Sequence, residues 1–343
     1  MIMEFADLYD SFGDLELMIL NLSESTLETM IILKLMVLRF SGTLKKLIIR
    51  VIDGVKSELY EGPEEKKIYL GYNRIAKIFF KACLTAGIST SVMYHMKPLE
   101  TRLRAVVNGN ESVPFVLPYR TRLFFDVEDW PTFWFVFVYQ SPMIYIHLFH
   151  TVTIGVLFSF VLHVCGKLAV LAFRIRNLKV DPEANSRHTK RVFHDIVDNH
   201  LEIIWMAKAI DDTFCMLLLE ELVTTTVILC LAAYNVLVNS DMADMTEFLS
   251  FLLYGSTMLL IVYGYCVAGE YLITESLNVH NAFYECQWYD MPNSFRKQLT
   301  ICMATTNQPL YLTGGHFYIF SMAGFTSVVK TSMAYLSMLR TII

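Results

Sequence analysis

The sequence contains little charge. Only 18% of its 343 residues are Asp, Glu, Lys or Arg, whereas a soluble domain has about 25%. The net charge is −5, and no stripe of Arg and Lys is present, which excludes a basic nucleic-acid-binding protein. The mean hydropathy is positive, at +0.44. A value this high over such a length excludes a disordered chain and a collagen-like repeat.

The chain also lacks the usual patterns of metal sites and enzymes. Its seven cysteines form no C-x-x-C pair, so we expect neither a zinc site nor a redox motif nor a disulfide framework. His147 and His150 are three residues apart, but a zinc ion would need further ligands on a facing helix. No Ser-His-Asp arrangement, P-loop or dinucleotide glycine pattern occurs. We therefore predict no catalytic residue, no metal and no cofactor.

Apolar residues, by contrast, make up 55% of the chain. They gather in runs of roughly 20 to 40 residues, without the ~10-residue alternation of barrel strands, which predicts a polytopic bundle of membrane helices. The third run is too long for one crossing and must continue into water as a helix. The six candidate spans are Leu15 to Phe40, Ile75 to Met96, Phe133 to Phe173, Phe214 to Val238, Phe248 to Leu272 and Tyr311 to Leu339.

The connections between these spans indicate an orientation. Lys and Arg gather after the first, third and fifth spans, whereas the connection 239–246 holds none. The positive-inside rule places the basic connections in the cytoplasm and the C-terminus outside. Asn110 begins a glycosylation acceptor, Asn-Glu-Ser, in an outward loop.

The front of the chain shows no secretory signal, because acidic residues interrupt any apolar region there. Six spans with the C-terminus outside also place Met1 outside. We therefore expect the chain to be short by one span at its front.

The cytoplasmic segments have helical patterns of their own. Residues 200–214 have an apolar stripe that includes Leu201, Ile204 and Trp205, which predicts that helices project below the membrane and pack together. Gly314-Gly315 follow Pro309. These helix-breaking residues predict that the last helix divides into a cytoplasmic piece and a membrane piece.

The last third of the chain contains a distinctive set of residues: Gly269-Glu270-Tyr271-Leu272, Glu275-Ser276, Ala282-Phe283-Tyr284, Trp288-Tyr289 and a closing run from Phe325-Thr326 through Lys330-Thr331-Ser332 and Tyr335-Leu336 to Leu339-Arg340. This set resembles the C-terminal region of the insect odorant receptor family. Pro118, Trp130-Pro131, Tyr139-Gln140, His200 and the run 221–224 fit the same pattern. Relative to this family, we expect the chain to be missing the first of seven helices.

The resemblance implies a seven-helix bundle with inverted topology relative to G-protein-coupled receptors. It divides the chain into outer-half ligand-binding helices (1–173), two helices with cytoplasmic projections (174–310) and a pore-lining last helix (311–343). It implies a tuning subunit that binds a small, volatile, hydrophobic odorant. Such a subunit assembles with an odorant coreceptor, as an expected tetramer, into a non-selective cation channel in the dendrite membrane of olfactory neurons.

In the last helix, Met338, Thr341 and Ile342 share one face. By resemblance they match the family's hydrophobic constriction and pore mouth, where an apolar ring closes a channel by dewetting. Spacing alone favours plain packing or lipid-facing residues, because helical periodicity does not say what a face touches. Lys330 in the same span must face protein or water, or snorkel, because a lysine at the bilayer centre costs about 2.5–3.5 kcal/mol.

A pocket for a volatile ligand needs aromatic and methionine walls with one or two polar groups, in the outer halves of the helices. For any single aromatic residue, ordinary bundle packing is the commoner explanation. The candidates are Ser89, Met93, Tyr94, Tyr139, Gln140, Met143, His147, Phe251 and Tyr254.

Three other protein classes remain as alternatives. A gustatory receptor channel is disfavoured because its Thr-Tyr-x5-Gln-Phe ending is absent. A secondary transporter usually shows broken helices in both halves, and we find one break. A G-protein-coupled receptor would have its C-terminus in the cytoplasm.

Overall fold

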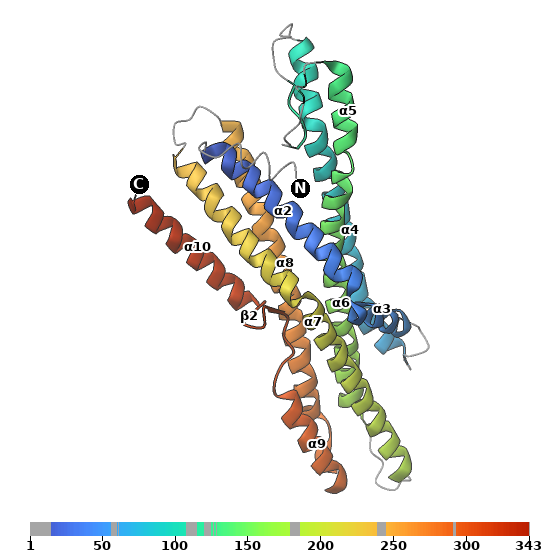
Figure 1. Cartoon of the computed structure of the whole chain (residues 1–343). Coiled ribbons are helices and arrows are strands. Elements are labelled where there is room, and N and C mark those ends of the chain that lie inside the picture. Colours follow the sequence, from blue (N-terminus) through green and yellow to red (C-terminus); the bar gives the residue numbers. More distant parts are fainter. Residues whose placement is uncertain are drawn as a thin grey trace.

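The computed structural model describes residues 15–55, 60, 62–107, 115–119, 125, 127, 129–178, 186–238, 245–290 and 293–342. Long helices run roughly side by side through the described part, and its strands are one two-residue pair (Figure 1). The predicted all-α class is therefore confirmed. The elements are α2 (Leu15–Phe40), α3 (Gly42–Gly54), α4 (Pro63–Val107), α5 (Trp130–Gln140), α6 (Met143–Arg176), α7 (Ser186–Val238), α8 (Met245–Glu285), η2 (Trp288–Asp290), α9 (Asn293–Thr306), β1 (Thr313–Gly314), β2 (Tyr318–Ile319) and α10 (Met322–Ile342).

Helix α6 is the central element of the bundle. It packs against α4, α7 and α8, and most of its residues from Ile154 to Ile175 are buried. Helix α6 is therefore apolar and enclosed by protein over this length. The other helices are therefore arranged around α6, which contributes the largest share of the main core.

The predicted third span is not one helix. The chain breaks at Ser141 and Pro142, and α5 and α6 meet there. Proline lacks an N–H group and its ring clashes with the carbonyl group four residues earlier, so the regular hydrogen-bond ladder cannot pass through it. The Ser141 N–H instead donates to Val138 O at 3.2 Å. The predicted continuation of this run as a helix is confirmed, since α6 extends to Arg176.

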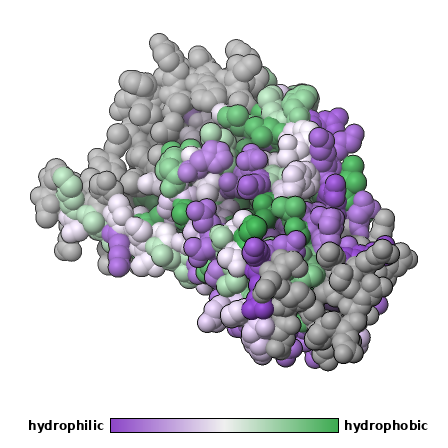
Figure 2. Space-filling model, turned by 90° about the horizontal axis from the view of Figure 1, so that it is seen from below, coloured by the Kyte–Doolittle hydropathy of each residue, from purple (hydrophilic) through white to green (hydrophobic). Residues whose placement is uncertain are grey.

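Helices also pack together at the lower end of the bundle, as predicted, but not through the whole predicted stripe: Leu201 and Trp205 are exposed, and α7 instead buries Ile203, Met206 and Ile210. The first half of α7 lies there with α9 and the last turns of α6 and α8 (Figure 1). The Phe193 and Phe295 rings, from α7 and α9, lie 5.6 Å apart edge to face. Burial lowers the pKa of His200, whose ring contacts Phe283. Hydrophilic residues are abundant on this end of the molecule (Figure 2), which suits a part that projects into water.

The last predicted span begins later than the sequence suggests. Residues 311–321 form no helix, and β1 and β2 instead pair as an antiparallel hairpin before α10 starts at Met322. Gly315 and His316 both have a φ of 62°, which reverses the chain direction and cannot continue a right-handed helix. The predicted division into α9 and a separate α10 is confirmed, but the start of the span at Tyr311 is wrong.

Helix α10 leaves the bundle at an angle and stands apart from the other helices towards its end (Figure 1). Its contacts are with α7 and α8. Met333 and Met338 on this helix are 63% and 60% exposed. Among the described residues, the segments Pro63–Arg104 and Trp130–Arg176 are long and apolar enough to cross a membrane.

Candidate functional site

The base of α10 is attached to α7 through the carboxylate of Asp211. This group accepts hydrogen bonds from the Thr313 backbone N–H at 2.6 Å and from the Thr313 hydroxyl at 2.9 and 3.0 Å. Hydrogen bonds to an ionised group are stronger than neutral ones. Strand β1 is therefore fixed to the middle of α7.

One turn further along α7, Cys215 fixes the tip of the hairpin. Its carbonyl oxygen accepts a hydrogen bond from Gly315 N–H at 3.2 Å, and its sulfur accepts one from His316 N–H at 3.2 Å. A β-carbon on Gly315 would lie 2.7 Å from Leu219 Cδ2. The positive φ and this close approach both favour glycine at position 315, although His316 adopts the same φ.

The other side of the hairpin is fixed to α8. A β-carbon on Gly269 would lie 2.0 Å from the Phe320 carbonyl oxygen, so only glycine permits this approach. The next residue, Glu270, accepts a hydrogen bond from Met322 N–H at 3.0 Å. A carboxylate at a helix N-terminus satisfies a free N–H group and interacts favourably with the helix dipole. The hairpin is therefore clamped between α7 and α8, and a shift of either helix would move the base of α10.

The predicted gate residues lie at the far end of α10. Met338 is 60% exposed within the single chain. Thr341 and Ile342 belong to the helix, but their side chains lie outside the described residues. Lys330 is exposed.

A charged cluster lies within the bundle, where α2, α6 and α7 meet. Lys34 and Glu221 form an ion pair, with side chains 4% and 2% exposed. His150 lies against both, with Nδ1 3.4 Å from Lys34 Nζ and Nε2 3.7 Å from Glu221 Oε1. A cavity of about 10 Å³ beside this cluster is lined by Lys34, Thr153, Tyr265 and apolar side chains. Ionisable side chains inside a bundle of membrane helices cost free energy to bury, and they usually have a function.

The outer part of the bundle contains a group of aromatic and polar side chains around Tyr119. The Gln140 amide donates to Tyr119 O at 3.0 Å and accepts from Tyr119 N–H at 3.3 Å. The His147 ring stacks on the Tyr119 ring at 5.8 Å, and the Tyr94 ring lies 5.7 Å from it. Three predicted pocket residues on α4, α5 and α6 are thus brought together by Tyr119, which the sequence analysis missed. We call Tyr94, His95, Tyr119, Gln140 and His147 the outer cluster.

His95 is the polar residue of the outer cluster that the sequence gave no reason to select. It is 3% exposed, and its ring lies 4.3 Å from the Phe137 ring. Neither ring nitrogen has a hydrogen-bond partner in the described part of the chain. The available signal was the spacing of Ser91, His95 and Leu99, which places them on one buried face of α4.

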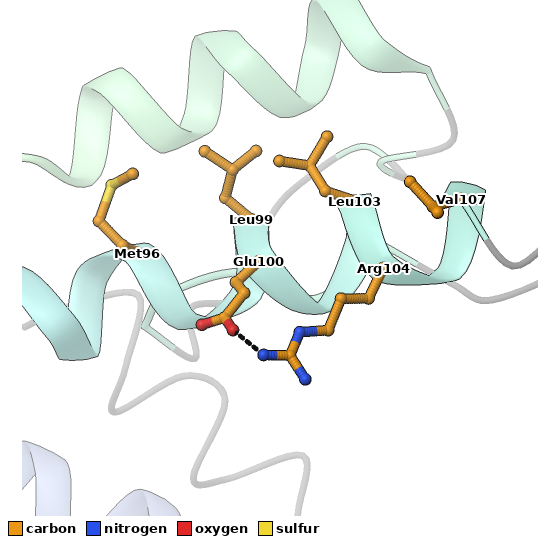
Figure 3. A pocket seen from close by; sticks show the side chains of 6 residues that line it. All are labelled: Met96, Leu99, Glu100, Leu103, Arg104 and Val107. Carbon is orange, nitrogen blue, oxygen red and sulfur yellow. Dashed lines mark hydrogen bonds and ion pairs between the residues drawn. The ribbon is translucent and has the colours of Figure 1, made fainter.

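An open hollow of about 680 Å³ lies along the end of α4, beyond the outer cluster. Met96, Leu99 and Leu103 point from α4 towards the neighbouring helix, whereas Glu100 and Arg104 point away and form an ion pair at 2.5 Å (Figure 3). Leu99 packs against Phe133 and Phe137 of α5. The hollow therefore has an apolar wall next to the outer cluster.

The remaining predicted pocket residues are not gathered at this site. Ser89 and Met93 are exposed on α4, and Tyr139 is 64% exposed. Met143 starts α6 and is half-buried. The side chains of Phe251 and Tyr254 lie outside the described residues, as does Asn110.

The comparisons with known proteins all indicate the same protein family. The family model described as 7tm Odorant receptor matches residues 14–333. Odorant receptor 13a of Drosophila melanogaster is 26% identical over 293 residues, which cover 79% of this chain and 69% of that protein. The odorant receptor coreceptor of Ooceraea biroi is 28% identical over 144 residues, which cover 42% of this chain and 30% of the coreceptor.

Solved structures show the same fold. The insect olfactory receptor OR5 from Machilis hrabei, in complex with eugenol, matches with a TM-score of 0.79 at 16% identity and covers all of this chain and 86% of that one. A second structure of that receptor matches with a TM-score of 0.80 at 14% identity and 85% coverage of that chain. The predicted membrane helix bundle is therefore confirmed.

Proposed function

Because this chain belongs to the insect odorant receptor family, we propose that it is the odorant-binding tuning subunit of an odorant-gated, non-selective cation channel. The observation that carries this proposal is the attachment of α10. The helix is clamped at its base by the hairpin on α7 and α8, yet it presents Met333 and Met338 as exposed side chains. An exposed apolar helix that is fixed at one end suits a position between subunits.

In the proposed channel, four such helices, one from each subunit, surround a pore. Met338 and Ile342 then form an apolar constriction, and Thr341 lies at the pore mouth. Ions lose their hydration in such a ring with nothing to replace it, so the closed pore excludes them. Opening requires the ends of the helices to separate, and the hairpin is the place where this movement begins.

The odorant binds in the outer half of each bundle, with the outer cluster as its polar end. Tyr94, Gln140 and His147 belong to that cluster, whereas Ser89, Met93 and Tyr139 are exposed elsewhere on the helices and are not part of it. Met143, Phe251 and Tyr254 stay as candidates for the apolar walls of the pocket. The Machilis receptor of the same fold was solved with eugenol, a small aromatic odorant. A related ligand class for this chain would be small, mainly apolar molecules with one hydrogen-bonding group.

Binding and opening are linked through α6 and α7. The odorant site uses α4, α5 and α6, and α6 packs against α7, which holds the hairpin through Asp211. An odorant that binds the open arrangement more tightly than the closed one shifts the population towards it.

The proposed partner is an odorant coreceptor, with which this chain forms a heterotetramer in the dendrite membrane of olfactory neurons. Residues 1–173 then act as the ligand-binding helices, residues 174–310 as the two helices with cytoplasmic projections, and residues 311–343 as the pore-lining helix. In this orientation the C-terminus and the Asn110 loop face outwards.

The test is whole-cell recording from cells that express the chain alone, a coreceptor alone, or both. An odorant panel should evoke inward current only in cells with both chains, because the tuning subunit needs its partner to complete the pore. The control for surface delivery is labelling of a C-terminal tag on intact cells, which should be accessible. A robust odorant current from the chain alone would contradict the assignment.

A further inference from the structure

Helix α3 lies between the end of α2 and the start of α4. Ser41 separates it from α2 and accepts a hydrogen bond from Leu44 N–H at 3.1 Å, which caps the new helix. In the view of Figure 1, α3 lies at about the height of the hairpin from which α10 starts. It therefore lies at the level where the predicted span from Leu15 to Phe40 ends.

One face of α3 is docked on the protein. Leu47 is fully buried, and Leu44 and Val51 pack against the main core. Arg50 lies 3.2 Å from a carboxylate oxygen of Glu202 on α7, and its guanidinium group lies 5.8 Å from the centre of the Trp205 ring. These contacts fix the rotation of α3 about its own axis.

That rotation leaves a second apolar face uncovered. Ile48, Ile49 and Ile52 are 40%, 52% and 62% exposed, and Val55 extends the same face. At 100° per residue these side chains form a sector beside the docked face. Large apolar groups of this kind gathered on one face mark an interaction surface.

The surroundings of this face are positively charged. Lys45 and Lys46 are exposed and have no ion pair among the described residues. With Arg50 and the single acid Asp53, three positive charges and one negative charge give α3 a net charge of +2. Arg39, at the end of α2, is exposed next to it.

We infer that α3 lies in the headgroup region of the bilayer, with Ile48, Ile49 and Ile52 among the acyl chains, and that Lys45 and Lys46 bind the headgroups of anionic phospholipids. Two observations favour lipid as the occupant of this face. Exposed apolar side chains of α2, including Met36 and the 83% exposed Phe40, extend the apolar surface as far as the start of α3. Its apolar sector, with Lys45 one turn before Ile48 and Ile49 and Lys46 beside the sector, is typical of helices that lie in the interface of a charged membrane. The inference does not depend on an odorant.

The depth of α3 tests the inference directly. The full chain is placed in nanodiscs of phosphatidylcholine and phosphatidylserine. A nitroxide label is attached at Ile52→Cys or, as the matched control, at Lys46→Cys. The signal of the chain that is labelled without either substitution is subtracted from both spectra. The Ile52 position should be relaxed by oxygen and protected from a water-soluble nickel chelate, and the Lys46 position should show the reverse. Equal access of the nickel reagent to both positions would overturn the inference. Protection of the Ile52 position from both reagents would indicate a protein partner and would also overturn it.

Lipid selectivity provides a second measurement. Each basic residue near an anionic surface is worth about 1 kcal/mol, so removing two should reduce the enrichment of phosphatidylserine around the chain by about thirtyfold. The variant is Lys45→Gln with Lys46→Gln, and the control is Lys297→Gln on α9, where the lysine is also exposed. Bound lipid is counted by native mass spectrometry from mixed nanodiscs. An unchanged enrichment in the double variant would reject the headgroup contacts, and an equal loss in the control would show a non-specific charge effect and reject them as well.

Discussion

The Phe320 carbonyl oxygen occupies the space where a side chain on Gly269 would stand, 2.0 Å from the position of its β-carbon. Strand β2 thus lies directly on the backbone of α8 just before α10 begins. Because the approach involves backbone atoms on both sides, it cannot be relieved by a change of side-chain rotamer. The junction of the anchor helices with α10 is therefore sensitive to a single methyl group.

Gly269→Ala should displace the hairpin and uncouple α10 from α8. Overpacking of this kind costs about 1–3 kcal/mol, so we expect a lower melting temperature of the purified chain and loss of most odorant-evoked current. Gly264→Ala is the matched control one turn and a half away, where the nearest atom would be 3.7 Å from the added carbon. Equal odorant-evoked currents in the two variants would show that the close contact of Gly269 with Phe320 does not couple α8 to α10.

Asp211→Ala should release β1 from α7. The substitution removes the acceptor for both donors of Thr313, the backbone N–H and the hydroxyl that the two carboxylate oxygens share, and a bond to a charged group is worth about 1.5–3 kcal/mol. We expect reduced odorant current at unchanged surface expression. Asp212→Ala removes an exposed neighbouring carboxylate and should behave like the wild type. A normal dose response in the Asp211 variant would show that the contact of Asp211 with Thr313 is dispensable.

The Lys34–Glu221 pair predicts strong coupling in a double-mutant cycle. Lys34→Met alone leaves Glu221 buried without its partner, at a cost of about 3–5 kcal/mol. Adding Glu221→Leu should restore much of the stability, because two apolar groups replace two charges. Thermal melts of the four proteins in detergent measure this coupling. Additive effects of the two substitutions would mean that the ion pair does not form.

Met338→Ser should open a hydrated path through the proposed constriction. With a coreceptor present, we expect basal current to rise several-fold, because a hydroxyl favours wetting of the closed pore. Met333→Ser is the control, since Met333 is similarly exposed but lies on a different face of α10. Unchanged leak through the Met338 variant would place the gate elsewhere.

His95→Phe should change the ligand range rather than abolish function. The variant removes two buried nitrogens that have no partner in the described structure, so the empty protein should gain about 1–3 kcal/mol of stability. Responses to odorants with a hydroxyl or carbonyl group should weaken, while those to hydrocarbon analogues of equal size persist. Dose-response curves for such matched pairs, together with thermal melts, provide the measurement. A parallel loss for both members of each pair, with reduced stability, would assign His95 a purely structural role.

Much of this fold follows from the periodicity and length of the apolar runs. The span predicted for Leu15 to Phe40 coincides with α2, and Gly314-Gly315 correctly marked the separation of α10 from α9. The break at Pro142 was missed because apolar residues continue on both sides of it. Hydropathy measures composition, whereas the break depends on one missing N–H group.

The site was less predictable because its contacts join distant parts of the chain. Lys34 and Glu221 are 187 residues apart, and each looks like an isolated charge in the sequence. Gln140 and His147 were selected for their position in the outer half of one predicted span, yet they meet through Tyr119, a loop residue with no periodic pattern around it. Spacing identifies residues on one helix face but not the segment that covers that face.

The central claim is that odorant binding opens a pore built from this chain. The most direct test applies odorants to outside-out membrane patches from cells that express the chain with a coreceptor, in the absence of GTP. The account predicts cation currents that begin within the time of solution exchange and that change their block or conductance in pore-helix variants at Met338. Currents that require GTP or diffusible messengers, or patches that stay silent while intact cells respond, would contradict it.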